Sequence, residues 1–266
     1  MLRSAFVLLI SAALGACSTG PVAPAAVVSD LAPMGKLRAA INFGNPVLAA
    51  KDPATGEPRG VSVDLSRELA ARLGVPVEFV SYQAAGRVVE GLKARAWDVA
   101  YVAIDPVRGA DMHQSPPYVV IEGSYLVAAG SPIRSNAEID REGVRVVVGQ
   151  GSAYDLFLSR ELKQAKIVRV ATSALVVDTL LAQKIEVAAG VRQQLEADAK
   201  RVSGVRLLEG RFMVINQAMG VPRSREAGAR YVRDFIEEMK ASGFIAQALR
   251  RHGIEGAAVA PAGDAR

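Results

Sequence analysis

The chain of 266 residues contains one cysteine and two histidines, and aromatic residues make up only 5% of it. A single cysteine excludes an intramolecular disulfide. The histidines, His113 and His252, lie far apart, and neither stands in a metal-ligand pattern. The sequence also lacks a G-x-S-x-G nucleophile elbow and a phosphate loop that ends in Lys-Ser or Lys-Thr. We therefore expect no metal ion and no cofactor.

Charge of one sign is not concentrated in any segment. The chain has 32 Lys and Arg against 27 Asp and Glu, a formal net charge of +5, and the signs are mixed along it. Without a Lys/Arg block or an aromatic stacking stripe, a nucleic-acid partner is not expected. Half of the residues are hydrophobic and 22% are charged, which is typical of a globular protein with a sizeable core.

The N-terminal apolar run is short. It spans residues 5–14 and follows a basic start at Arg3, which predicts a secretory signal peptide over residues 1–16. A membrane span needs about 20 apolar residues, and polar Ser18 ends this run well before that. Cys17 follows small residues and resembles the lipid-acceptor cysteine of a bacterial lipobox. That resemblance implies diacylglycerol on Cys17, cleavage before it and attachment to a membrane; the alternative is an ordinary buried thiol.

Both flanks of the predicted globular part have a loop-like composition. Residues 18–32 are rich in Pro, Ala and Val, so we expect residues 17–33 to form the lipidated cysteine and a flexible tether. Residues 254–266 are rich in Ala and Gly and predict a flexible tail.

Between these flanks, strand and helix patterns alternate twice. The first set has strands at 37–41, 77–80 and 98–104, with a helix capped by Ser62 and ended by Gly74, and another around residues 88–92. The second set has strands at 144–148, 167–170 and 185–189 and helices at 152–162 and 173–182. Extended stretches at 118–129 and 212–221 separate and follow the second set, before helices at 224–239 and 242–251.

Two βαβ-rich halves predict an α/β protein with two parallel-sheet lobes. We expect lobe 1 to comprise residues 34–126 and 217–253, and lobe 2 to comprise residues 127–216. Two crossing segments near 123–130 and 217–221 would form a hinge. The cleft between such lobes is a natural ligand site.

Several segments, in order, carry a family resemblance: Gly35-Lys36-Leu37-Arg38, Gly60-Val61-Ser62-Val63-Asp64-Leu65, Trp97-Asp98-Val99-Ala100, Asp105-Pro106-Val107-Arg108 with Ser115-Pro116-Pro117-Tyr118, and Gly149-Gln150-Gly151-Ser152. Together they resemble the extracellular solute-binding proteins of family 3, receptors of polar amino-acid ABC importers. The resemblance spans about residues 35–253. It implies the type II periplasmic-binding-protein fold, with a two-segment hinge and a ligand cleft. It also implies a monomer in the periplasm or cell envelope, with a permease and its ATPase as partners.

The resemblance assigns a role to Arg108, because the arginine of this motif pairs with the ligand's α-carboxylate in the family. A planar guanidinium presents a fork of N–H donors that matches a carboxylate. The alternative is a solvated surface charge. Gly151, Ser152 and Ala153 form a second expected anion site, at the start of a helix whose first N–H groups are free. The alternative there is a plain helix cap by Ser152.

Other positions leave two interpretations open. Asn42 and Asn45 match cleft-lining positions of the family, although Asn45 before proline is also an ordinary turn. Tyr82 either walls the cleft or packs inside lobe 1. Ala103 stands where the family commonly has a hydroxyl residue, and Val191 where it often has the aspartate that binds the ligand's α-ammonium.

These departures predict a small carboxylate, an amino acid or close derivative, whose second group is held in an unusual way. Asp105, where the family has threonine, would bind an ammonium in one version. Arg192 would favour a second anionic group in the other, and the alternative for Arg192 is a solvated residue at the start of a helix. Two rival functions remain: a cyclohexadienyl dehydratase-like enzyme, which needs a general acid in the cleft, and a solute sensor without transport. We expect a binding protein rather than an enzyme.

Overall fold

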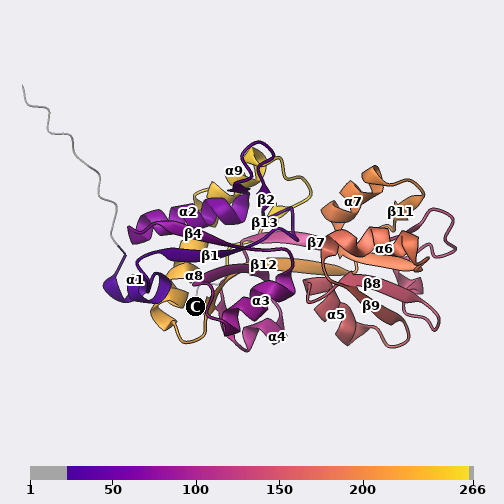
Figure 1. Ribbon diagram of the computed structural model, residues 1–266, viewed down its shortest axis with the longest axis horizontal. Helices are drawn as coiled ribbons and strands as arrows, with labels where there is room; N and C mark the ends of the chain where they lie inside the picture. Colours follow the sequence, from indigo (N-terminus) through magenta and orange to yellow (C-terminus); the bar gives the residue numbers. More distant parts are fainter. Residues whose placement is uncertain (1–22, 264–266) are drawn as a thin grey trace, which may run out of the picture.

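The computed structural model describes residues 23–263, so the predicted signal peptide and Cys17 lie outside the described residues. Two lobes lie along the long axis of the molecule, and two long strands run between them (Figure 1). None of the helices within the described part of the chain combines the length and the hydrophobicity that a membrane crossing requires.

Lobe 1 contains the first βαβαβ unit. Its parallel strands lie in the order β4-β1-β5, with Leu37 opposite Val77 and Ala39 opposite Val99. All five residues of β5 are buried, as expected for a strand covered on both faces. The elements are β1 (Leu37–Asn42), α2 (Val61–Leu73), β4 (Val77–Tyr82), α3 (Ala85–Lys93) and β5 (Val99–Ala103).

Helix α2 begins before the expected cap. Its N-cap is Gly60, whose φ is 125°, and a Cβ there would lie 2.4 Å from the Leu48 carbonyl oxygen. The prediction that Ser62 caps this helix was therefore wrong, since Ser62 lies inside the first turn with its hydroxyl 3.3 Å from the Tyr118 hydroxyl. Gly74 ends the helix in the left-handed conformation, as predicted.

Lobe 2 repeats the arrangement with parallel strands in the order β10-β8-β9. Its elements are β8 (Arg145–Gly149), α5 (Ala153–Glu161), β9 (Lys166–Val170), η2 (Ser173–Leu175), α6 (Val176–Ala182), β10 (Val187–Val191), α7 (Arg192–Arg201) and β11 (Val205–Leu207).

Strands β7 (Val119–Ala128) and β12 (Met213–Pro222) join the lobes into one continuous sheet. Beyond residue 122, β7 pairs with β10 of lobe 2; from residue 217, β12 pairs with β5 of lobe 1. The chain therefore crosses between the lobes where residues 119–123 pair with residues 213–217. The sequence predicted the two hinge segments a few residues later, near 123–130 and 217–221.

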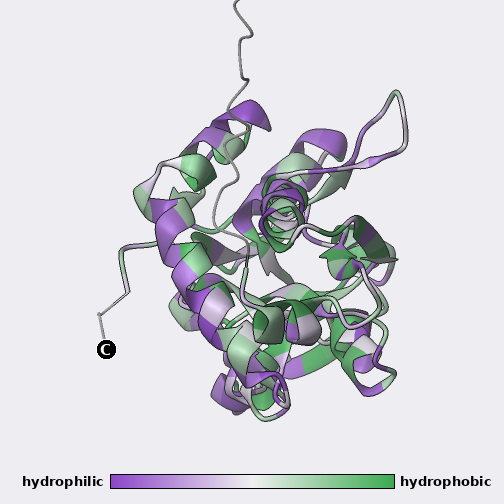
Figure 2. Cartoon of the chain, turned by 90° about the vertical axis from the view of Figure 1, so that its left-hand side faces the viewer, coloured by the Kyte–Doolittle hydropathy of each residue, from purple (hydrophilic) through white to green (hydrophobic). Residues whose placement is uncertain are grey.

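The helices after β12 return to lobe 1. They are α8 (Glu226–Ala241) and α9 (Phe244–Arg251), and helices at this end of the molecule carry hydrophilic and hydrophobic residues side by side (Figure 2). The shorter elements are β2 (Ala50–Lys51), β3 (Pro58–Arg59), α4 (Pro106–Gly109), β6 (Met112–Gln114) and η1 (Asn136–Glu138).

Both flanks are more structured than their composition predicts. Residues 25–31, expected in the flexible tether, form α1 (Ala25–Leu31), because Val27 and Leu31 share one face and are buried. The Asp30 carboxylate accepts a hydrogen bond of 2.9 Å from the Gly228 N–H at the start of α8. In the expected tail, β13 (Ala258–Val259) pairs with β7.

Candidate functional site

A small cavity lies between the lobes. It is bordered by the carboxyl ends of β1 and β5, the crossing strand β12 and the first turn of α5. This is where a ligand is expected in an α/β protein of two lobes. The lining residues are Asn42, Gly44, Asn45, Ala85, Tyr101, Val102, Ala103, Arg108, Ser152, Ala153, Tyr154, Ser173, Ile215 and Gln217.

Arg108 lines this cavity and is only 2% exposed, so it is not the solvated surface charge that the sequence left open. It lies on α4, a single turn directly after β5. Its Nη1 donates to the Ala103 carbonyl (3.1 Å) and its Nη2 to the Gly151 carbonyl (2.8 Å). Its Nε is buried and bonds none of the described residues.

The guanidinium of Arg108 therefore has carbonyl partners but no hydrogen-bonded carboxylate among the described residues. Burial lowers its pKa to about 10, and the nearby charge of Asp105 partly offsets that effect. The group stays protonated at neutral pH. Two of its five N–H donors are used, so the fork retains donors for an anion.

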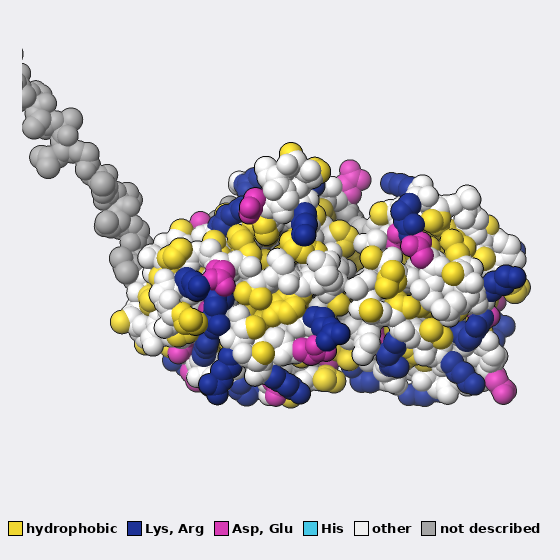
Figure 3. Space-filling view, in the orientation of Figure 1, with side chains coloured by type: hydrophobic (Ala, Val, Ile, Leu, Met, Phe, Trp, Pro, Cys, Tyr) yellow, Lys and Arg dark blue, Asp and Glu magenta, His cyan; other side chains and the backbone are white. Residues whose placement is uncertain are grey.

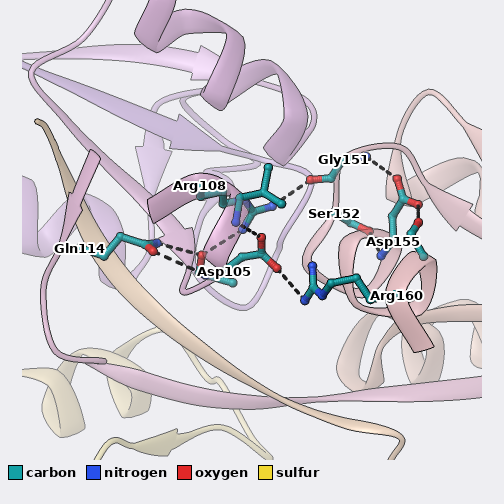
Figure 4. A network of polar contacts seen from close by, with 10 residues as sticks. Asp105, Arg108, Gln114, Gly151, Ser152, Asp155 and Arg160 are labelled. Atoms are coloured by element: carbon teal, nitrogen blue, oxygen red, sulfur yellow. Dashed lines mark hydrogen bonds and ion pairs between the residues drawn. The ribbon is translucent and has the colours of Figure 1, made fainter. Parts of the chain in front are cut away.

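Asp105 is held away from the cavity. Its Oδ1 accepts the Val107 N–H (2.9 Å) and caps α4, and its Oδ2 accepts from Nη2 of Arg160 (3.0 Å). Figure 4 shows this carboxylate directed at Arg160, which comes from α5 in lobe 2. Asp105 does not line the cavity, so the geometry does not favour the expectation that it binds a ligand ammonium.

The described residues make at least three contacts that join the lobes beside the cavity. Two of them are the Arg108–Gly151 hydrogen bond and the Asp105–Arg160 ion pair (Figure 4). The third is a close backbone approach, because a Cβ on Gly151 would lie 2.7 Å from the Gly86 Cα. Gly151 also has a φ of +70°, which favours glycine.

The start of α5 is a well-capped helix terminus. The Ser152 hydroxyl accepts the Asp155 N–H (3.0 Å), and the Asp155 carboxylate accepts the Gly151 N–H (2.8 Å). Ser152 is therefore the helix cap that the sequence allowed, and the Gly151 N–H is not free for an anion. Ser152 and Ala153 still line the cavity, and N–H groups of a first helical turn have no intrahelical acceptor. Ligand binding there stays a prediction.

Asn42 and Asn45 both reach the cavity. The Asn42 Oδ1 accepts the Gly44 N–H (2.9 Å), which shapes the turn after β1. Asn45 is 8% exposed, and its side-chain amide makes no hydrogen bond with another described residue. The turn and the lining position, which the sequence presented as alternatives, therefore occur together.

Two predicted site residues lie elsewhere. Tyr82 packs against the cluster of Ala40, Val88 and Trp97 inside lobe 1, so it does not wall the cavity. Arg192 pairs with Glu122 (3.1 Å) and also donates to the Gly210 carbonyl. These bonds hold it away from the cavity lining.

Sequence reasoning missed Gln217, Tyr101, Tyr154 and Ser173 as lining residues. Gln217 lies on β12 opposite Ala103 and is 4% exposed. One signal was available in the sequence: the polar pair Asn216-Gln217 interrupts an otherwise apolar strand. Tyr154 donates its hydroxyl to the Ser173 Oγ (2.7 Å), which fixes both side chains at the lobe 2 wall.

Residues 37–255 match the family model of the bacterial extracellular solute-binding proteins, family 3. The chain belongs to this family. A comparison with curated protein sequences found no match. The predicted type II periplasmic-binding-protein fold is confirmed by this match and by the solved structures that resemble the chain.

Those structures are amino-acid-binding proteins. A mutant of ArgBP from T. maritima has a TM-score of 0.74 and 19% identity, covering 86% of this chain and 100% of that chain. The solute receptor for L-cysteine of Neisseria gonorrhoeae has a TM-score of 0.74 and 21% identity, covering 87% and 94%. An ancestral amino acid-binding protein, a precursor of cyclohexadienyl dehydratase, has a TM-score of 0.71 and 20% identity, covering 84% and 97%.

Proposed function

We propose that this protein is the substrate-binding component of an ABC importer. It captures a small carboxylate-bearing solute, an amino acid or a close derivative, in the cavity between its lobes. It then delivers the solute to a membrane permease driven by a partner ATPase. Family membership and the amino-acid-binding structural relatives support this proposal.

One observation carries the carboxylate assignment: Arg108 is a buried cation in the interlobe cavity, without a hydrogen-bonded carboxylate among the described residues. Removing a charge from water costs several kcal/mol, and the cost is recovered only by good partners. A ligand carboxylate would supply the missing charge and match the guanidinium fork.

The proposal is tested by a thermal-shift screen of amino acids and small carboxylates, followed by calorimetric titration of the best ligand. A ligand that binds the folded state raises its stability. Arg108→Ala should cost about 30-fold to several thousand-fold in affinity, as expected for a broken buried charge pair. Arg108→Lys should also weaken binding, because an ammonium cannot reproduce the fork. Full affinity in a folded Arg108→Ala variant would refute the assignment.

We propose further that the protein acts as a monomer in the periplasm or cell envelope, attached by lipid on Cys17.

Lys and Arg are scattered among Asp and Glu over the face in Figure 3, which gives no support to a nucleic-acid partner.

The dehydratase and sensor alternatives have less support. The lining residues, all within residues 23–263, include no Asp, Glu or His, and the hydroxyls of their two tyrosines, Tyr101 and Tyr154, are hydrogen-bonded to Ser66 and Ser173. Turnover of prephenate or arogenate would establish the enzyme instead. A sensor would use the same cavity, and uptake assays with the partner permease separate it from an importer.

A further inference from the structure

The cavity wall has one charged side chain among the described residues, the cation Arg108. An α-amino acid brings an ammonium as well as a carboxylate, and the ammonium needs its own anionic or acceptor partner. A buried ammonium without such a partner is costly. The carboxylates near the cavity therefore decide which ligands it accepts.

Both nearby carboxylates are already engaged. Asp105 bonds the Val107 N–H and Arg160, and it does not line the cavity. The Asp155 carboxylate accepts a hydrogen bond from the Gly151 N–H (2.8 Å) and forms an ion pair with Arg169 (3.0 Å). Asp155 is also not among the residues that line the cavity. Neither side chain can turn toward a ligand without breaking these bonds.

The balance of charge around the cavity favours one anion and no additional cation. The Asp105 charge is matched by Arg160, and the Asp155 charge by Arg169, which leaves the Arg108 charge to be matched. One ligand carboxylate completes the balance. An ammonium on the neighbouring ligand atom would instead stand close to a buried guanidinium of the same sign, in surroundings where water screens poorly.

Neutral polar groups are available where the ammonium partner is missing. The amides of Asn45 and Gln217 both reach the cavity, and both side chains are more than nine-tenths buried. The Asn45 Oδ1 is buried without a hydrogen-bond partner among the described residues, and Gln217 lies on β12 opposite Ala103. An amide offers a donor and an acceptor, which suits a hydroxyl, keto or amide group of a ligand and leaves no net charge.

We infer that the protein binds a small carboxylate whose second polar group is uncharged, such as a 2-hydroxy acid, in preference to a free α-amino acid. This inference rests on the proposed carboxylate-binding function. Arg108 binds the carboxylate, and the buried amides of Asn45 and Gln217 bind the neutral group.

The test uses matched acids that differ only at the α-carbon, titrated calorimetrically into the unmodified mature protein. Each set contains the simple acid, its L-2-hydroxy acid and the L-amino acid. Suitable sets are propanoate, lactate and alanine; 4-methylpentanoate, 2-hydroxy-4-methylpentanoate and leucine; and 3-phenylpropanoate, 3-phenyllactate and phenylalanine. In the set that binds most tightly, the hydroxy acid should bind at least tenfold more tightly than either companion.

A variant assigns the preference to the amide. Gln217→Leu should reduce the affinity for the hydroxy acid at least tenfold while leaving that for the simple acid within about threefold. Gln247→Leu, on the exposed face of α9, is the matched control and should change neither affinity. The comparison in the unmodified protein decides the ligand class even if Gln217→Leu fails to fold.

The outcomes separate the two levels of the proposal. An amino acid that binds as tightly as its hydroxy acid would overturn the inference and leave the carboxylate-binding function intact. A simple acid that matches the hydroxy acid would overturn the role of the amides. Binding by none of the nine acids would overturn the carboxylate-binding function as well.

Discussion

The ion pair between Asp105 and Arg160 should favour closure of the two lobes, because its partners come from different lobes. The Asp105 side chain is 4% exposed and the Arg160 side chain is 43% exposed, so water screens the pair from one side only. Exposed pairs contribute at most about 1 kcal/mol. We take about 0.5–1 kcal/mol for this one, which corresponds to a loss of about two- to fivefold in ligand affinity on Arg160→Gln.

The assay combines calorimetric titration of the tightest-binding acid with small-angle scattering, with and without that acid. Arg160→Gln should weaken binding, mainly through faster dissociation, and should require more ligand to reach the compact form. The loss should shrink at high salt, since screening weakens the pair in the unmodified protein. Asp105→Asn keeps a good helix cap for α4 and should reproduce the effect.

Arg230→Gln is the matched control, because Arg230 pairs with Glu226 (3.8 Å) within a single helix of lobe 1. The Arg230→Gln variant should bind the tightest-binding acid with the same affinity as the unmodified protein. If Arg160→Gln behaves like this control at low salt, or if the protein does not compact at saturating ligand, the assignment of the pair to closure is wrong.

Three further predictions concern the rest of the chain. Gly151→Val should weaken ligand binding by more than tenfold, because the added atoms meet Gly86 when the lobes approach, and it should also lower the unfolding temperature, because a β-branched residue is strained at the φ of +70°; unchanged titration would contradict this. Asp98→Ala should destabilise the fold by about 3–5 kcal/mol in urea unfolding, since Asp98 is buried and pairs with two arginines; a loss below 1 kcal/mol would contradict this. Cys17→Ser should release the protein from the membrane fraction, and retained attachment would refute lipidation.

The lobes and most of their elements could be predicted from the sequence, because apolar periodicity and glycine positions report local structure. The strand at 77–80 and the stop at Gly74 are examples that the structure confirms. The family resemblance also predicted that Arg108, Asn42 and Asn45 face the cleft, and all three residues line the cavity.

The positions of the other site residues could not be predicted, because they depend on contacts between segments far apart in the chain. Asp105 and Arg160 are separated by 55 positions, and nothing local shows that the arginine draws this carboxylate away from the ligand. The same holds for Arg192 at the start of α7, whose partner Glu122 lies on β7, 70 positions away. Composition misled at both flanks, because Val27 with Leu31 and the short β13 pack onto lobe 1 despite their Ala- and Pro-rich surroundings.

The path of β7 and β12 leads us to expect an order of folding. Residues 124–212 lie between the two crossings, so lobe 2 has all its strands before β12 is made. Lobe 1 instead waits for β12 to pair with β5, for α8 to pack and for β13 to pair with β7. These late contacts close long loops, which slows their formation. We therefore expect lobe 1, which contains the N-terminal half of the described residues, to be completed last and to be more accessible to proteases and chaperones until then.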